Sequence, residues 1–96
     1  MGRTLNNARF SLGRVLATPG ALAALERAGQ TVSCLLQRHQ RGDWGETCWE
    51  DAQLNEEAVQ GGGRIFSAYV LSTGVKVWVI TEANRTATTA LLPDEY

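Results

Sequence analysis

The fold of this chain is decided by residues 64–92, which run RIFSAYVLSTGVKVWVITEANRTATTALL. Three runs within this segment are rich in β-branched and aromatic residues, whose side chains pack well on a pleated, half-buried surface. Residues 72–74 and 83–85 interrupt the runs, and Gly74 and Asn84 are the residues there that most readily take the positive φ of a short hairpin loop. The segment therefore predicts a meander of three antiparallel strands.

Loops of three residues would set the register of this meander, because loop length decides which residues of a hairpin face one another. In the first hairpin Ala68 would face Trp78, and in the second Trp78 would face Ala90. One sheet face is then almost entirely apolar or small, and we predict that it is the core side. Its members are Ile65, Ser67, Tyr69, Leu71, Val75, Val77, Val79, Ala87, Thr89 and Leu91. A shorter loop would exchange the faces of one strand.

The opposite face is mixed, and it holds most of the candidate functional residues. Its binding candidates and neighbours are Arg64, Phe66, Lys76, Trp78, Ile80 and Glu82. An exposed patch of this kind, several hundred Å² in area, usually marks a protein partner or a dimer contact. The alternative is that a helix of the same chain covers it. Among partners, the sequence favours a protein or a second copy of the chain through this sheet face over nucleic acid, and it predicts no membrane contact.

A catalytic use of the same face is the main alternative function. Small ribonucleases and ribosome-dependent toxins often carry acid, base and phosphate-binding groups on one face of an antiparallel sheet backed by helices. Here Glu82 would be the base and His39 the acid. Arg64 and Arg85 would form the phosphate clamp. Because Arg64 opposite Glu82 is also an ordinary cross-strand ion pair, the balance favours a non-enzymatic protein.

Upstream of the meander, the pattern predicts a short strand over residues 12–17 followed by helices. Thr18 and Pro19 provide the N-cap and first turn of one helix, and Gly29 can stop it in the left-handed conformation. Thr31 can cap the next helix. The stripe of that helix at i, i+3, i+4 and i+7 consists of Val32, Leu35, Leu36 and His39.

A third helix is predicted over residues 46–60, with an acidic first turn and a glycine hinge at 61–63. The fold class is therefore α+β, with two or three N-terminal helices and a short leading strand packed on a C-terminal antiparallel meander of three or four strands. We expect a loose tail over residues 1–10 and a single domain over 11–96. A cytoplasmic protein is expected, because the chain contains no apolar run of the roughly 20 residues that span a bilayer.

Charge is segregated along the chain. Residues 1–41 carry six arginines and one acidic residue, Glu26, whereas residues 42–63 carry six acidic residues and no basic one. In one interpretation the two segments pack together and neutralise each other. In the other they form a bipolar surface, with an acidic patch that suits a basic partner.

A second group of candidates surrounds the loop after the second predicted helix. His39 lies between Arg38 and Arg41, so a general base beside phosphate-binding arginines is one interpretation. A histidine that bonds the carbonyls at the helix end is the favoured one. Trp44 is predicted to plug the edge of the core, with an exposed recognition ring as the alternative. DNA binding through Arg38 and Arg41 would define a third class, a DNA-associated regulator.

The cysteines predict neither a metal site nor a cofactor. Cys34 and Cys48 match no CxxC or Cys/His ligand spacing, and they lie in segments with a helical pattern. We therefore expect buried free thiols, with a disulfide as the less favoured alternative. No cofactor and no metal are expected.

Several segments of the sequence resemble a family of small, uncharacterised proteins carried on plasmids and integrative elements. They are LGRVLATPGAL, RHQRGDWGE, RIFSAY, KVWVITEANRTATTALLP and the final DEY. Members are often labelled plasmid-related, and some carry a label as a type I restriction methylase subunit. This sequence lacks the cofactor fold and the Asn-Pro-Pro-aromatic motif that a DNA methylase needs. The resemblance implies an accessory protein of a mobile element.

Overall fold

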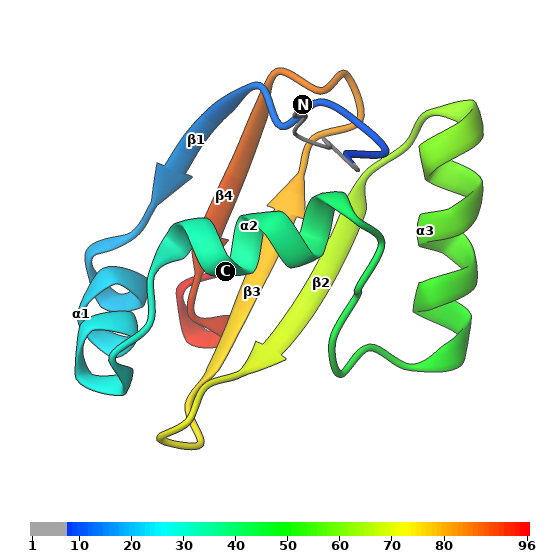
Figure 1. Ribbon diagram of the computed structural model, residues 1–96. Helices are drawn as coiled ribbons and strands as arrows, with labels where there is room; N and C mark the ends of the chain where they lie inside the picture. The colour runs from blue at the N-terminus through cyan, green and yellow to red at the C-terminus, as the bar shows by residue number, and fades with distance from the viewer. Residues whose placement is uncertain (1–7) are drawn as a thin grey trace, which may run out of the picture.

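The computed structural model describes residues 8–96, which form an α+β fold built on one four-stranded sheet. The elements in chain order are β1 (Arg14–Ala17), α1 (Pro19–Ala28), α2 (Val32–Gln40), α3 (Trp49–Gly61), β2 (Ile65–Val70), β3 (Lys76–Thr81), β4 (Ala87–Leu91) and the 3-10 turn η1 (Pro93–Glu95). The strand order is β1-β4-β3-β2. Figure 1 shows α2 crossing one face of the sheet, α1 below β1, and α3 standing beyond β2. The predicted α+β class is confirmed.

The sheet is mixed, so the prediction of a purely antiparallel sheet is wrong. β1 pairs with β4 in the parallel direction, with Arg14 beside Ala87 and Ala17 beside Ala90. Parallel neighbours need a long crossover between them, and here three helices and the β2–β3 hairpin intervene between β1 and β4. The predicted short strand therefore becomes an edge strand of the same sheet.

The predicted helix caps of α1 and α2 are confirmed. The hydroxyl of Thr18 accepts a hydrogen bond from the backbone N–H of Ala21 at 3.1 Å, and Gly29 ends α1 at φ 70°. The hydroxyl of Thr31 accepts one from the N–H of Cys34 at 3.2 Å. These local signals work because each is made by neighbours in the sequence.

Helix α3 begins at Trp49, later than predicted, because residues 44–46 are engaged elsewhere. The N–H of Ala68 in β2 donates to the carbonyl of Trp44 at 3.1 Å, and the N–H of Glu46 donates to the carbonyl of Ala68 at 2.6 Å. Residues 44–46 thus lie along the outer edge of β2 as a short parallel bridge, and the helix starts only after they have passed it.

The first hairpin has the predicted register. Phe66 faces Ile80 and Ala68 faces Trp78. The second hairpin is shifted by one residue, because Trp78 faces Leu91 instead of Ala90. Its loop spans residues 83–86, and it is closed by a hydrogen bond of 2.9 Å from the N–H of Glu82 to the carbonyl of Ala87.

The longer loop exchanges the two faces of β4, as a register shift of one residue must. Thr88 and Ala90 point toward α1 and α2 and are fully buried, so the predicted core positions Ala87, Thr89 and Leu91 lie on the opposite face. The residue with positive φ in this loop is Arg85, at 61°, and not Asn84. The main core, between the sheet and these two helices, is formed by Ala21, Ala24, Leu25, Leu35, Tyr69, Leu71, Val77, Val79 and Ala90.

The outer edge of β2 is closed by groups from the same chain. Beside the bridge of residues 44–46, the side-chain amide of Asn55 in α3 pairs with the backbone of Phe66. Its Nδ2 donates to the Phe66 carbonyl at 2.7 Å, and its Oδ1 accepts from the Phe66 N–H at 3.0 Å. Asn55 is 2% exposed. Its amide therefore substitutes for a neighbouring strand and holds α3 against the sheet.

We expect Asn55→Ala to lower the free energy of unfolding by roughly 1 to 3 kcal/mol, because both backbone groups of Phe66 lose their partner. Urea unfolding followed by circular dichroism measures this change. Gln53→Ala on the exposed side of the same helix is the control, with a change within about 0.5 kcal/mol. Equal stability of the two variants would contradict the role assigned to Asn55.

Candidate functional site

The sheet face opposite α1 and α2 is neither bare nor fully covered: it holds a groove of about 340 Å³. Its lining residues are Asp51, Leu54, Arg64, Phe66, Trp78, Ile80 and Tyr96. Strands β2 and β3 form the floor, α3 forms one wall, and the C-terminal turn forms the other. The two outcomes predicted for this face, an open patch or a covering helix, are thus each met in part.

Aromatic rings form a connected series across the groove. Phe66 and Trp78 meet edge to face, with ring centroids 5.1 Å apart, and Trp78 meets Tyr96 in the same way at 5.8 Å. The guanidinium of Arg64 donates to the Tyr96 hydroxyl at 2.6 Å. Pro93 begins the turn that brings Tyr96 back over β3. The C-terminal turn therefore returns Tyr96 to the body of the protein.

The walls of the groove leave apolar surface in contact with solvent. Leu54 is 59% exposed and Tyr96 is 67% exposed, whereas Ile80 on the floor is 5% exposed. Asp51 and Arg64 are the charged side chains of the lining. The arrangement suits an apolar group that enters between α3 and the C-terminal turn with a polar group at its rim.

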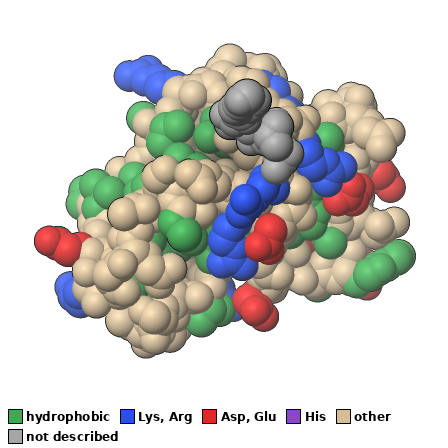
Figure 2. Space-filling view, in the orientation of Figure 1, with side chains coloured by type: hydrophobic (Ala, Val, Ile, Leu, Met, Phe, Trp, Pro, Cys, Tyr) green, Lys and Arg blue, Asp and Glu red, His purple; other side chains and the backbone are tan. Residues whose placement is uncertain are grey.

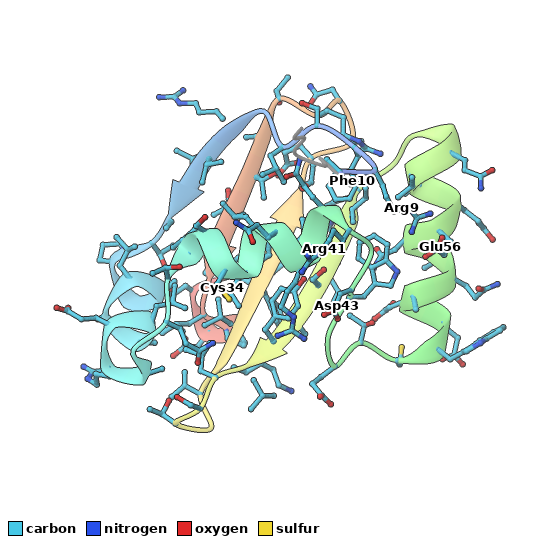
Figure 3. All side chains as sticks on the ribbon, viewed as in Figure 1. Arg9, Phe10, Cys34, Arg41, Asp43 and Glu56 are labelled. Atoms are coloured by element: carbon cyan, nitrogen blue, oxygen red, sulfur yellow. The ribbon has the colours of Figure 1, made fainter. Side chains whose placement is uncertain are left out.

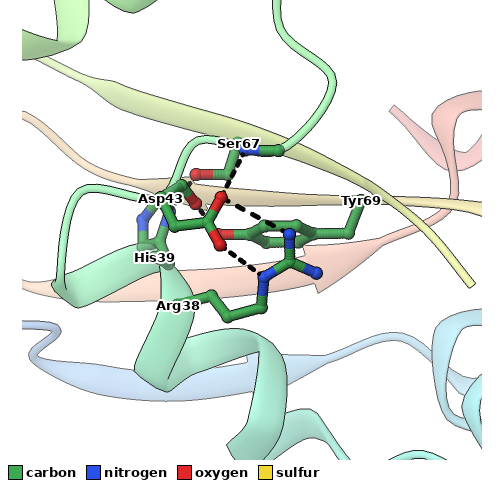
Figure 4. Close-up of polar contacts among 6 residues, drawn as sticks. Arg38, His39, Asp43, Ser67 and Tyr69 are labelled. Carbon is green, nitrogen blue, oxygen red and sulfur yellow. Dashed lines mark hydrogen bonds and ion pairs between the residues drawn. The ribbon is translucent and has the colours of Figure 1, made fainter.

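His39 lies on the other side of the sheet, in a fully buried chain of polar side chains. Figure 4 shows His39 with Ser67, the first member of this chain. Its Nδ1 is 2.6 Å from the hydroxyl of Ser67 in β2, and its Nε2 is 2.9 Å from the hydroxyl of Thr81 in β3. Thr81 is 2.7 Å from the hydroxyl of Thr88 in β4, which donates to the carbonyl of Leu12 at 2.7 Å. The chain thus joins α2 to β2, β3 and β4.

The direction of these bonds assigns the tautomer of His39. Thr88 has one hydroxyl hydrogen and gives it to the carbonyl of Leu12, so Thr81 must donate to Thr88. The oxygen of Thr81 is then free only to accept, so Nε2 of His39 carries the hydrogen. Nδ1 accepts from Ser67. Every polar atom of the neutral ring is therefore satisfied, and burial lowers the pKa of His39 from 6.5 to about 4.

Two aromatic rings seal His39 from solvent. The rings of Phe10 and Trp44 meet it edge-on, with centroids 5.1 and 6.0 Å away. Trp44 is 7% exposed, and its Nε1 donates to Glu56 at 3.1 Å. Trp44 therefore closes the edge of the core. His39 bonds hydroxyl groups rather than the helix-end carbonyls that the sequence suggested.

Arg38 and Arg85 are engaged within the protein. Arg38 donates to the carboxylate of Asp43 at 2.7 Å and lies 4.5 Å from the centroid of the Tyr69 ring (Figure 4). The Tyr69 hydroxyl donates to the Asp43 carbonyl at 2.6 Å, and burial raises the pKa of Tyr69 to about 12. Arg85 donates to four backbone carbonyls, including those of Ala58 and Gly63 at 2.7 and 2.6 Å. It holds the end of α3 to the β3–β4 loop.

The structure does not bring the four nuclease candidates to one surface. His39 is buried behind Thr81, whereas Glu82 is exposed and, as the next residue after Thr81, points away from it. Arg64 bonds Tyr96 instead of Glu82, so the predicted cross-strand ion pair is not formed. Among residues 8–96, the ion pairs are Arg9–Glu56 and Arg38–Asp43. Arg85 is occupied by carbonyl groups.

The binding candidates are likewise divided. Phe66 and Trp78 line the groove, as does Arg64. Lys76 and Arg41 are exposed at other places, Lys76 at the start of β3 and Arg41 at the end of α2. Asp51 and Leu54 of α3 were not recognised in the sequence as lining residues, because only the tertiary fold places them beside the sheet.

The basic and acidic segments meet in part, as one interpretation of the charge pattern predicted. Arg9, which the sequence assigned to the tail, forms an ion pair of 2.8 Å with Glu56 on α3 (Figure 3). Figure 2 shows basic and acidic side chains adjoining on this side of the molecule. Residues 1–7 of the predicted tail lie outside the described residues. On α3, Glu50 and Glu57 are exposed and form none of the ion pairs in the described chain.

The predicted burial of the cysteines is wrong. Cys34 and Cys48 are free, but both are exposed, because Cys34 lies on the outer side of α2 and Cys48 is the N-cap of α3. Within residues 8–96, no three His, Cys, Asp or Glu side chains gather as metal ligands could. None of the helices in this part of the chain has the length and apolar character to cross a membrane.

Sequence reasoning missed the hydrogen-bonded chain of His39, although a signal for it existed. Ser67 belongs to the predicted core face, and His39 belongs to the predicted helix stripe with Val32, Leu35 and Leu36. A polar residue in a core needs a partner, and these two positions are polar members of otherwise largely apolar surfaces. Thr88 could not be found in this way, because the predicted register put it on the wrong face.

No protein-family model, curated protein or solved structure matches the chain. Its function must therefore be argued from its own geometry. In residues 8–96, that geometry includes a buried polar chain closed to solvent and a groove open to it.

The buried histidine makes a specific prediction about pH. Because the pKa of His39 is lower in the folded protein than in the unfolded chain, the unfolded chain takes up the proton first. We expect full stability above the unfolded pKa of 6.5 and a loss that grows as the pH falls toward about 4. The slope is about 1.4 kcal/mol per pH unit, and the total is roughly 3 kcal/mol.

Urea unfolding at several pH values between 7.5 and 5 measures this slope, since the chain has one histidine and carboxylates bind protons mainly at lower pH. His39→Gln is the control, because the slope should vanish in it whatever its absolute stability. A flat wild-type profile over this range would show that His39 is not buried in its neutral form.

Proposed function

We propose that this protein is a non-enzymatic interaction module whose groove receives an apolar side chain of a protein partner. The observation that carries the proposal is the aromatic floor of Phe66 and Trp78, which stays accessible beside Leu54, itself 59% exposed. A role on a mobile genetic element is part of the proposal. It rests on the resemblance of several sequence segments to a family of plasmid and integrative-element proteins.

The groove has the properties of a site for an anchoring side chain. A volume of about 340 Å³ accommodates a large aliphatic or aromatic side chain with part of its backbone. The rings of Phe66, Trp78 and Tyr96 hold one another edge to face, so they lose little conformational freedom when a partner binds. Rigid aromatic surface around a pocket is typical of the positions that dominate binding energy.

The charge around the groove favours a partner with basic residues. Asp51 lies in the lining, and Glu50 and Glu57 are exposed on the same helix. Residues 49–61 contain no lysine or arginine. Arg64, directly before β2, keeps its positive charge, but its guanidinium is held by the hydroxyl of Tyr96. An apolar anchor flanked by Lys or Arg would thus find both a pocket and a complementary rim.

The other two functions have less support. A nuclease needs its acid and base at one substrate, but His39 and Glu82 point to opposite faces of the sheet. A DNA-associated regulator would use Arg38, whose guanidinium is held by Asp43 and the ring of Tyr69. Neither arrangement leaves the required groups available together.

Selection from a displayed library of random peptides tests the proposal directly. We expect the selected peptides to share an aromatic or large aliphatic residue next to Lys or Arg, since these match the floor and rim of the groove. Leu54→Glu should weaken the binding of a selected peptide by roughly tenfold or more, because it places a charge on the apolar wall.

Leu22→Glu is the matched control, since Leu22 is 49% exposed on α1 at the other face of the sheet. Binding to this variant should equal binding to the wild type, as measured by fluorescence anisotropy. Selected peptides that bind Leu54→Glu and Leu22→Glu equally well, or a library from which no peptide is selected, would overturn the proposal.

A further inference from the structure

The two edges of the sheet differ in whether other groups of the chain cover them. The outer edge of β2 is closed by Asn55 and residues 44–46, whereas β1 at the opposite edge has β4 as its one neighbour within residues 8–96. Figure 1 shows β1 at the margin of the molecule with no other element beyond it. Val15 is 45% exposed and Leu16 is 43% exposed. This edge combines unpaired backbone groups with apolar side chains.

Alternation along β1 identifies the backbone groups that point outward. The N–H of Arg14 donates to Thr86 and the N–H of Thr18 donates to Ala90, so residues 14, 16 and 18 face β4. The N–H and C=O groups of Val15 and Ala17 therefore point away from the sheet. Arg14–Ala17 contains neither proline nor lysine nor a bulge, so its protection as an edge consists of its short length and the charge of Arg14 at its start.

We propose that β1 pairs with β1 of a second copy of this chain, antiparallel and centred on Leu16. The extended segment runs from Arg14 to Thr18, bounded by Gly13 at φ 65° and by the start of α1. Its midpoint is Leu16, so a two-fold axis there pairs the whole segment with itself. Val15 then exchanges two hydrogen bonds with Ala17 of the other copy, and the symmetric pair adds two more.

Charge complementarity favours a second copy over an unrelated strand. In this register Arg14 lies opposite Thr18 of the other copy. The hydroxyl of that Thr18 donates to the carboxylate of Glu95, which the C-terminal turn places at the start of α1. Each dimer therefore brings Arg14 toward Glu95 twice, once at each end of the paired segment.

The side chains also match across the axis. Leu16 shares a face with Thr89 of β4 and so lies on the groove side of the sheet, where it would meet Leu16 of the other copy. The pairing joins two four-stranded sheets into a continuous one and places both grooves on the same side. The two β3 strands, which carry Trp78, would be five strand spacings apart, about 24 Å.

Cross-linking tests the register directly. In a Cys34→Ser, Cys48→Ser background, Leu16→Cys should form an intermolecular disulfide under mild oxidation, because non-hydrogen-bonded partners in an antiparallel pair lie about 4.5 Å apart at Cα. Arg14→Cys is the matched control and should not cross-link to itself, because residue 14 faces residue 18 of the other copy. Equal cross-linking of the two variants would overturn the proposal.

Sedimentation equilibrium of the full chain tests the dimer without cysteine chemistry. The wild type should show a monomer–dimer equilibrium, which Leu16→Lys weakens roughly tenfold or more by placing two like charges opposite each other. Arg14→Glu should weaken it by a similar factor through repulsion from Glu95. Val75→Lys, at a residue 38% exposed in the β2–β3 turn, should leave it unchanged. A wild type that stays monomeric at high concentration, or variants that all behave alike, would refute the pairing.

Discussion

A single chain of hydrogen bonds holds the layers of this protein together. It begins at Ser67, passes through His39 and Thr81, and ends through Thr88 at the carbonyl of Leu12. It thereby connects α2 with three strands and with the segment that leads into β1. Because each hydroxyl has one hydrogen to give, the chain is complete only in one direction and only with a neutral imidazole. The hydrogen bonds of this chain therefore depend both on the position of α2 and on the registers of the strands.

This interior constraint separates the two faces of the sheet. The face toward α1 and α2 is closed by the apolar core and by Trp44, so its polar groups serve the fold. The opposite face is bordered by α3 and the C-terminal turn, which leave a groove over Phe66 and Trp78. The residues that could serve in catalysis or binding thus lie on different sides of the sheet. The histidine stabilises the fold, and the aromatic residues remain accessible. The same asymmetry appears at the sheet edges, since within residues 8–96 the edge of β2 is closed by other segments of the chain and the edge of β1 is not.

The floor of the candidate site could be predicted from the sequence, but its walls could not. Alternation along β2 and β3 correctly placed Phe66 and Trp78 on one face, since strand side chains alternate whatever surrounds them. The walls of the groove come from Leu54 and Tyr96, far from the strands in sequence, so no local pattern could assign them. The nuclease hypothesis treated His39 and Glu82 as neighbours, but the sheet itself lies between them.

The sequence by itself determined the strands, the first hairpin register and the caps of α1 and α2, because these depend on alternation and on contacts within a few residues. Only the tertiary structure decided the second hairpin and the place of β1. Arg85 adopts a positive φ while its side chain bonds distant carbonyls, and this longer loop exchanges the faces of β4. β1 joins the sheet beside β4 because the backbone of a strand must find partners, and the nearest free edge belonged to a strand about seventy residues away.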